Sequence, residues 1–253
     1  MLTAAYAPLN AATASPVGTY IYVAMAASDE AYGGGGENDI QSQAVDHLMV
    51  ADYVTYDNFW KVRYQGISRA NTVIEAMQEG AVGYEAFKND PDQLGQYKGE
   101  ALFLRGLYYF ELAQLFERVP LMMSTLDDIA CGQAEPDQIY AAIASSLKEA
   151  SEIMPSKAYN SVEAGHATRW ASQALLARVF LFYTGFYGKE TLPLMDGSSL
   201  SKAQVAAYLD DCIQNSGHDL VGDFRNLWPY TNKSTIKDYP YVAEAVDADG
   251  NGL

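Results

Sequence analysis

The chain has 253 residues, enough for one large domain or two small ones with a buried core. Apolar residues make up 49% and charged residues 19%, a balance typical of globular rather than disordered proteins. With 32 acidic against 16 basic residues the formal net charge is −16, which disfavours nucleic acid and anionic membrane surfaces as partners. Neutral ligands such as sugars carry no such penalty.

The first part of the chain combines a short helical pattern with a long irregular stretch. Residues 1–12 read as a helix, whereas residues 13–57 read as irregular and contain four consecutive glycines at positions 33–36. A loop this long inside a compact domain is usually functional or disordered. We therefore treat segment 13–57 as a candidate ligand-binding region.

The strongest helical signal lies near the middle of the chain. A helix capped by Asp57 or Asn58 is predicted to run to about residue 77, with Gly80 as its stop. Asp90-Pro91 marks the next start. Residues 97–119 then carry apolar side chains three and four positions apart on most sides of the helix, which is predicted to end at Pro120. A helix this apolar should be central and contact neighbours on several faces.

Three further helices are predicted in the second half. They cover residues 136–154, stopped by Pro155, then 168–183 with an alanine stripe that favours close helix packing, and a segment from a capping box at Ser201 to Gly217. No β-hairpin is predicted. The sequence therefore indicates an all-α protein of antiparallel helix pairs packed side by side, as in helical-repeat arrays.

A family resemblance rests on several blocks of residues. The stretch GEALFLRGLYYFEL at 99–112, followed by FERVPL at 116–121, resembles the signature helix of the SusD/RagB family, roughly E-A-x-F-L-R-A-x-Y-Y-F-x-L and then L-F-G-x-V-P-L. Gly106 stands in place of the usual alanine and Glu117 in place of the usual glycine. Four further blocks resemble the family in the same order: 28–30, 60–71, 139–155 and 167–179.

The resemblance implies a scaffold of tetratricopeptide-like helix pairs, lipid-anchored on the outer face of a Gram-negative outer membrane. Such proteins cap a TonB-dependent, SusC-like porin and deliver oligosaccharide to it. Family members are about twice this length. We therefore expect residues 1–253 to be the amino-terminal helical part of a single SusD-like domain, without the lipoprotein signal and the carboxy-terminal half. This part alone is expected to bind sugar weakly or not at all.

Catalytic motifs are not found in the sequence. The three histidines, His47, His166 and His218, are far apart, and no H-E-x-x-H, G-x-S-x-G or P-loop pattern occurs. An acid pair assembled from distant positions, as glycosidases use, stays open. We expect a non-catalytic binding protein. The alternative is a helical-repeat scaffold that binds a protein or peptide partner.

Aromatic residues are abundant, with 19 Tyr, 9 Phe and 3 Trp. Tyrosine and tryptophan offer sugars a flat apolar face and a hydrogen-bonding group, although most of these rings lie on helical stripes and should belong to the core. The irregular segment 13–57 and its end supply candidates of another kind. Our candidate ligand-binding residues are Tyr32, Asp39, His47, Tyr53 and Tyr56. The alternative is that these aromatic side chains pin the loop down.

Two arginines in apolar helices and the two cysteines are expected to have structural roles. Arg105 and Arg178 lie within very apolar helices, so each is expected to run its stem along the core and bind a carboxylate or carbonyl group with its guanidinium. For Cys131 and Cys212, unpaired and partly buried thiols are favoured over a disulfide.

The carboxy-terminal residues DADGNG at 247–252 match the start of an EF-hand-type calcium loop. The residues that would ligate calcium are Asp247, Asp249 and Asn251, but the glutamate that completes such a loop does not follow. A polar turn is therefore favoured over a metal site, and no cofactor is expected.

Overall fold

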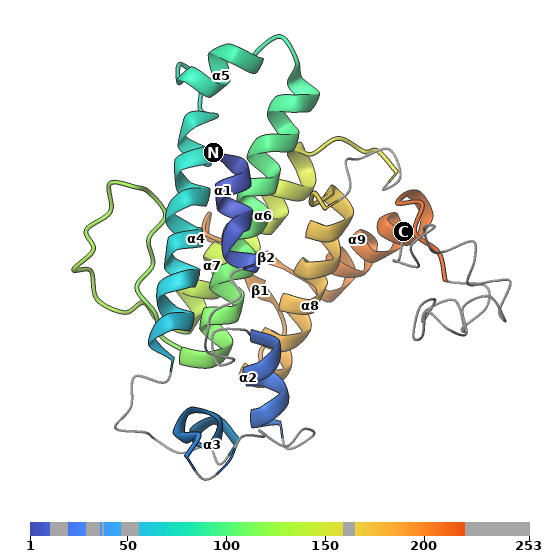
Figure 1. Ribbon diagram of the computed structural model, residues 1–253. Helices are drawn as coiled ribbons and strands as arrows, with labels where there is room; N and C mark the ends of the chain where they lie inside the picture. Colours follow the sequence, from blue (N-terminus) through green and yellow to red (C-terminus); the bar gives the residue numbers. More distant parts are fainter. Residues whose placement is uncertain (11–19, 29–35, 37, 47–55, 159–164, 221–253) are drawn as a thin grey trace, which may run out of the picture. The chain divides into compact units, whose positions relative to one another are not determined.

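The computed structural model describes residues 1–10, 20–28, 36, 38–46, 56–158 and 165–220. The chain divides into two units, Met1–Ser216 and Gly217–Leu253, and the helices and strands of the described residues lie in the first (Figure 1). The helices are α1 Leu2–Tyr6, the 3-10 helix η1 Ala7–Asn10, α2 Tyr20–Ala27, α3 Ile40–Asp46, α4 Asp57–Ala76, α5 Val82–Phe87, α6 Pro91–Phe116, α7 Pro136–Ile153, α8 Arg169–Tyr187 and α9 Lys202–Asn215. The all-α prediction is confirmed.

Helix α6 lies at the centre, as its apolar pattern predicts. It begins where Asp90 Oδ1 accepts a hydrogen bond from the Gln93 N–H (3.0 Å), with Pro91 in the first turn. It packs against α4 and α7 most extensively and also contacts α1, α5 and α8. Its Leu104, Tyr108 and Leu112 are fully buried. The buried core is therefore organised around one long helix with partners on several sides.

Glycines allow α4 and α7 to approach α6 closely. A Cβ atom on Gly66 of α4 would overlap the ring of Tyr108, and one on Gly106 of α6 would lie 2.9 Å from the side chain of Leu147 in α7. A Cβ on Gly99 would likewise overlap Met154. The alanine stripe at 167–177 does not play this role uniformly, because Ala174 is exposed.

We expect Gly66→Ala to lower the free energy of unfolding by about 1–3 kcal/mol, because the added methyl group must displace the Tyr108 ring. Gly185→Ala is the matched control: it lies in α8, is exposed and has open space around it, so the same change should stabilise by about 0.5–1 kcal/mol. Denaturant unfolding of both variants measures this. Equal effects of the two substitutions would contradict close packing at Gly66.

Several helix ends lie where the sequence predicts them. Helix α7 stops at Ile153 before Pro155, and α8 begins where the Thr168 hydroxyl accepts from the Ala171 N–H (3.2 Å). Ser201 and Gln204 form the predicted capping box of α9. The predicted cap of α4 is wrong, because Tyr56 occupies the N-cap position and makes no side-chain capping bond.

Two predictions about irregular regions need correction. The segment 13–57 is not irregular throughout, since it contains α2 and α3, which pack together through Val23, Ala26 and Val45. A short hairpin, which the sequence did not predict, follows α8. Its strands β1 Leu192–Pro193 and β2 Ser199–Leu200 are antiparallel, with Leu192 opposite Leu200 and Pro193 opposite Ser199. At two residues each, these strands are too short to show an alternating pattern.

Helix α6 ends earlier than Pro120, at a strained turn. Glu117 has φ 59° and ψ −62°, and the Arg118 N–H donates to the Phe116 carbonyl (2.6 Å). This is the geometry of a classic γ-turn, which is rare and strained. Among the described residues Glu117 has the sole positive φ outside glycine, at a position where the family pattern has glycine.

Glu117→Gly should therefore stabilise the protein by roughly 0.5–1 kcal/mol, since it relieves left-handed strain of about 1–2 kcal/mol at the cost of a more flexible unfolded chain. Glu117→Ala is the control, because it removes the carboxylate but keeps the Cβ atom that causes the strain. Chemical denaturation distinguishes the two. Stabilisation by alanine equal to that by glycine would assign the effect to charge instead of backbone strain.

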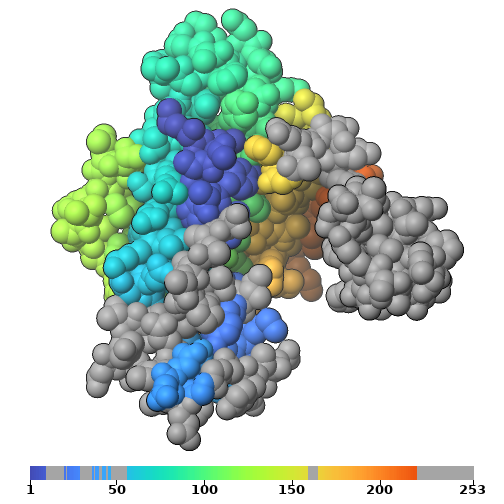
Figure 2. Space-filling view, viewed as in Figure 1, coloured from blue at the N-terminus to red at the C-terminus, as the bar shows by residue number. Residues whose placement is uncertain are grey.

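Helix α1 lies across α4 and α6, as Figure 2 shows. The Tyr108 hydroxyl donates to the Ala5 carbonyl (2.7 Å), and Arg69 donates to the Ala4 carbonyl (3.0 Å). The Tyr6 hydroxyl donates to the buried carboxylate of Glu100 (2.6 Å). These contacts hold the amino-terminal helix on the central packing.

Candidate functional site

The predicted ligand-binding residues are only partly described by the structure. Tyr32, His47 and Tyr53 lie outside the described residues. Asp39 precedes α3, where its carboxylate accepts from the Ser42 N–H (3.1 Å) and hydroxyl (2.8 Å). Tyr56 is half-buried at the start of α4 and packs edge-on against Phe116 with a centroid distance of 6.2 Å. The contacts of Asp39 and Tyr56 with these neighbours support the structure locally, and their predicted ligand contacts stay predictions.

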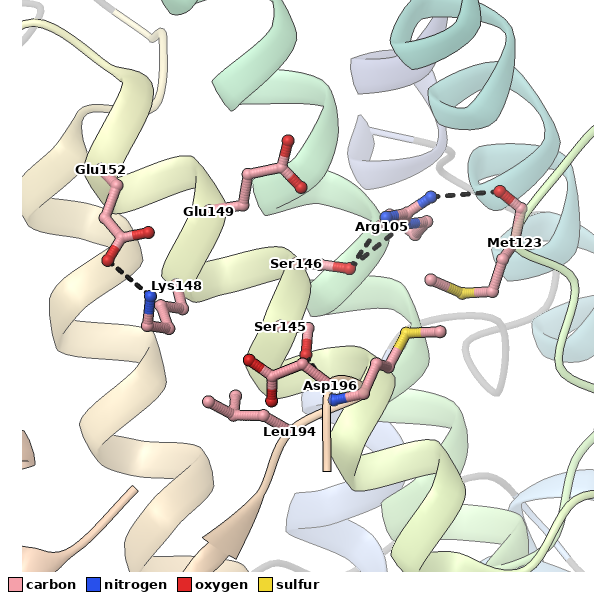
Figure 3. A pocket seen from close by; sticks show the side chains of 10 residues that line it. Arg105, Met123, Ser145, Ser146, Lys148, Glu149, Glu152, Leu194 and Asp196 are labelled. Carbon is pink, nitrogen blue, oxygen red and sulfur yellow. Dashed lines mark hydrogen bonds and ion pairs between the residues drawn. The ribbon is translucent and has the colours of Figure 1, made fainter. Parts of the chain in front are cut away.

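A pocket of about 340 Å³ opens between α6, α7, the segment after α6 and the β1–β2 turn (Figure 3). Arg105 and Met123 line one side, and the Lys148–Glu152 pair of α7 lies on the other. The remaining lining residues are Ser145, Ser146, Glu149, Leu194, Met195 and Asp196. None of these lining residues is aromatic, so the pocket offers hydrogen-bonding groups and aliphatic surface.

Arg105 is a buried cation bound by neutral acceptors. Only 7% of the residue is exposed, and its guanidinium donates to the Ser146 hydroxyl (3.1 and 3.2 Å), to Asn71 Oδ1 (3.1 Å) and to the Met123 carbonyl (3.2 Å). Burial lowers the pKa of Arg105 from its usual value, although a guanidinium in a protein stays charged. The prediction that Arg105 binds a carbonyl group is thus confirmed.

The donors of Arg105 are not all used. A guanidinium carries five N–H groups, and the contacts above engage four of them. One Nη2 hydrogen has no acceptor within the part of the chain that the structure describes. Since Arg105 lines the pocket, this donor is a candidate ligand contact.

The prediction that Arg178 runs along the core and binds a carboxylate or carbonyl group is wrong. Its side chain is exposed on α8, where the apolar pattern on other faces of the helix gave no indication of the outward position. A helix that is apolar on most sides still has an outer face, and hydropathy alone does not locate it.

The other charged groups of the pocket are paired or capped. Lys148 Nζ lies 2.6 Å from Glu152 Oε1, and Glu149 Oε1 lies 2.7 Å from Lys98 Nζ. Hydrogen bonds from the Ser198 hydroxyl and N–H lower the pKa of Asp196. These contacts leave Glu149 Oε2 and Asp196 Oδ2 without a described partner.

The two walls of the pocket that lie outside helices, the β1–β2 turn and the segment after α6, are held by hydrogen bonds. The Met195 N–H in the hairpin turn donates to the Ser145 hydroxyl of α7 (2.9 Å). On the opposite side, Asp127 accepts from the Met123 N–H (2.6 Å) and the Ser124 N–H (2.9 Å). Hydrogen bonds within the fold therefore fix the backbone of two walls of the pocket.

Sequence reasoning gave Arg105 a structural role and predicted none of these residues as the lining of a pocket. Ser145 and Glu149 lie on one helix and Asp196 lies about 50 positions further along, in a turn that the sequence did not predict. No spacing signal joins such residues, because only the tertiary structure brings them together. Hydropathy predicts the helices that carry them and not the hairpin that closes the pocket.

We expect Arg105→Met to lower the free energy of unfolding by about 2–4 kcal/mol, because the buried acceptors Asn71 and Ser146 lose their donor. Arg178→Met is the matched control and should change stability by less than about 0.5 kcal/mol, since Arg178 is exposed. Thermal and denaturant unfolding of both variants test this. A loss of similar size in both would show that the burial of Arg105 carries no special weight.

Cys131 and Cys212 are both free thiols, as predicted. The calcium candidates Asp247, Asp249 and Asn251 lie outside the described residues. Within the described residues, no group of three or more histidine, cysteine or acidic side chains converges as metal ligands would. No helix in the described ranges has both the length and the hydropathy needed to cross a bilayer.

A family model described as "Starch-binding associating with outer membrane" matches residues 5–181. The chain belongs to the SusD-like family. A curated SusD-like protein from Bacteroides ovatus is 26% identical over 213 residues, which cover 80% of this chain.

Solved structures share the fold at low sequence identity. A laminarin-binding SusD-like protein has a TM-score of 0.66 at 24% identity over 92% of this chain. A structure determined with xylogluco-oligosaccharide has a TM-score of 0.65 at 21% identity over 91% of this chain. Surface glycan-binding protein A from Bacteroides fluxus has a TM-score of 0.68 at 23% identity over 90% of this chain. The chain spans 36% of the curated relative and 44–49% of these three solved chains.

Proposed function

We propose that this protein captures oligosaccharide at the cell surface without chemically altering it. The observation that carries this proposal is the SusD-like family match over residues 5–181. The structure adds a formed pocket whose lining offers hydrogen-bonding and aliphatic groups, which suits a hydroxylated ligand. The net charge of −16 favours neutral over anionic glycans.

Glu100 and His166 form an acid–histidine pair whose contacts favour a structural role over a catalytic one. His166 Nδ1 lies 2.7 Å from Glu100 Oε2, which resembles a catalytic arrangement. Glu100 is only 1% exposed, however, and its carboxylate also accepts from the Tyr6 hydroxyl (2.6 Å) and Gln96 Nε2 (2.8 Å). A carboxylate occupied in this way ties α1 and the segment before α8 to α6, and has little access to a substrate.

The family suggests a place and a partner for this capture. A lipid anchor would hold the protein on the outer membrane, where it would deliver its ligand to a TonB-dependent, SusC-like porin. Residues 1–253 would then be the amino-terminal helical part of a longer protein. In support, α8 and α9 carry exposed apolar side chains, with Leu181, Phe186 and Ile213 exposed to 68%, 69% and 75%. A further part of a SusD-like domain would cover such side chains.

The rival function is a scaffold that binds a protein or peptide. The exposed apolar side chains of α8 and α9 would serve it equally well. The DNA that flanks the reading frame separates the two functions: a lipoprotein signal ending in a cysteine and a neighbouring porin gene support glycan uptake. Neither feature would be expected beside a cytoplasmic scaffold.

Calorimetry with maltoheptaose, laminarihexaose and xyloglucan oligosaccharides tests the proposal on the protein produced from its complete reading frame. We expect binding of at least one neutral glycan, weakened by Tyr32→Ala, Tyr53→Ala or Tyr56→Ala by about 1 kcal/mol or more for each ring that stacks on sugar. Tyr56→Phe is the control, since it keeps the ring and its contact with Phe116.

Unchanged affinity in all three alanine variants would assign these tyrosines to loop structure alone. Failure of the parent protein to bind any of the glycans, together with capture of a peptide partner, would favour the scaffold function instead.

A further inference from the structure

The pocket beside Arg105 is small. Its volume of about 340 Å³ lies at the lower end of the range for small-molecule pockets, about 300–1,000 Å³. The buried guanidinium of Arg105 lies at its wall between α6 and α7, and the hairpin turn covers another side (Figure 3). A volume of this size suits the end of an oligosaccharide better than a long polymer segment.

The unused hydrogen-bonding groups of the lining are both donors and acceptors. Arg105 has one N–H without a described acceptor, and the Ser145 hydroxyl accepts from Met195 and so keeps its own hydrogen for donation. Glu149 Oε2 and Asp196 Oδ2 are acceptors that the described residues leave unoccupied. A sugar residue carries several hydroxyl groups that each donate and accept, so it matches this mixture.

Charge selects against an acidic ligand. The lining holds two cations, Arg105 and Lys148, and three carboxylates, Glu149, Glu152 and Asp196, which leaves an excess of one negative charge. The net charge of the chain is also strongly negative, at −16. A carboxylate or phosphate on a ligand would meet these acids at close range, whereas a neutral ligand meets no such repulsion.

The apolar part of the lining is aliphatic. Met123, Leu194 and Met195 contribute it, and Met195 is 56% exposed at the opening. Methionine side chains adapt to irregular surfaces, so they can pack on the C–H groups of a ring without a flat aromatic platform. Hydrogen bonds would therefore determine the orientation of a ligand here.

We propose that this pocket binds the terminal residue of a neutral oligosaccharide, with Glu149 and Asp196 accepting hydrogen bonds from its hydroxyl groups and Arg105 donating one. This inference rests on the proposed function and assigns to it a binding subsite whose lining residues differ from the tyrosines predicted above. The site is preorganised, because Asp196 is held by Ser198 and the hairpin turn is held by Ser145.

Glu149→Ala and Asp196→Ala test the subsite in the protein produced from its complete reading frame. By calorimetry with the neutral oligosaccharides named above, each variant should bind about tenfold more weakly, as expected for the loss of a hydrogen bond to a charged group. Asp210→Ala is the matched control, because it removes an exposed acid of α9 away from the pocket lining and should leave the affinity unchanged. Asp196→Asn is a second control, because its amide oxygen can still accept the hydrogen bonds from Ser198 that hold the turn. It should bind more tightly than Asp196→Ala.

A direct readout uses the methionine methyl groups. In a spectrum of methyl-labelled methionine, the oligosaccharide should shift the signals of Met123 and Met195, which line the pocket, and not that of the exposed Met25 in α2. An oligogalacturonide should shift them less because it is anionic.

The outcomes are distinguishable. Glycan binding by the parent with unchanged affinity in both variants, or without shifts of the Met123 and Met195 signals, overturns the subsite and leaves the proposed function standing. Preference for the oligogalacturonide overturns the charge argument. A parent protein that binds none of the glycans overturns the subsite and the proposed function together.

Discussion

The close approach of α4 and α7 to α6 is the constraint on which the rest of the structure depends. Gly66 lets α4 pack closely on Tyr108 of α6, and Gly106 of α6 lets Leu147 of α7 pack closely on it. Side chains at these glycines would separate the helices and leave space in a core that normally packs as densely as an organic crystal. Because α6 is thus covered on several faces, its apolar residues need no outer polar stripe, and the segments attached to its ends take up fixed positions.

Arg105 connects this packing with the pocket. Its side chain leaves the central helix and reaches Asn71 on α4, Ser146 on α7 and the carbonyl of Met123 after α6. A buried charge is costly unless its hydrogen bonds are made, so these contacts fix the relative positions of three helices and one loop. The part of the pocket wall that Arg105 forms is consequently held by the core behind it, which lowers the ordering cost of binding a ligand there.

The sequence predicted those features that depend on neighbours along the chain. Asp90-Pro91, Thr168 and the Ser201 capping box act within one helical turn, and the helices that they begin were predicted closely. The β1–β2 hairpin and the turn at Glu117 were missed, because two-residue strands show no period and because a glutamate gives no sign of a positive φ. The pocket could not be predicted for a similar reason, since its residues come from α6, α7 and a turn far apart in the sequence.

The two kinds of sugar contact considered for this protein differ in a way that suits a delivery role. Tyrosine faces bind many sugars through shape and dispersion, whereas a small hydrogen-bonding pocket recognises the end of a chain. Each contact alone is weak, but a repeating polymer can engage several at once, and the gain in effective concentration raises the overall affinity. A receptor that hands its ligand to a porin must also release it, and several weak contacts can be given up one at a time, so that no single step breaks the whole interaction. A small pocket that offers hydrogen-bonding groups and aliphatic surface, without aromatic side chains, is therefore consistent with capture followed by transfer.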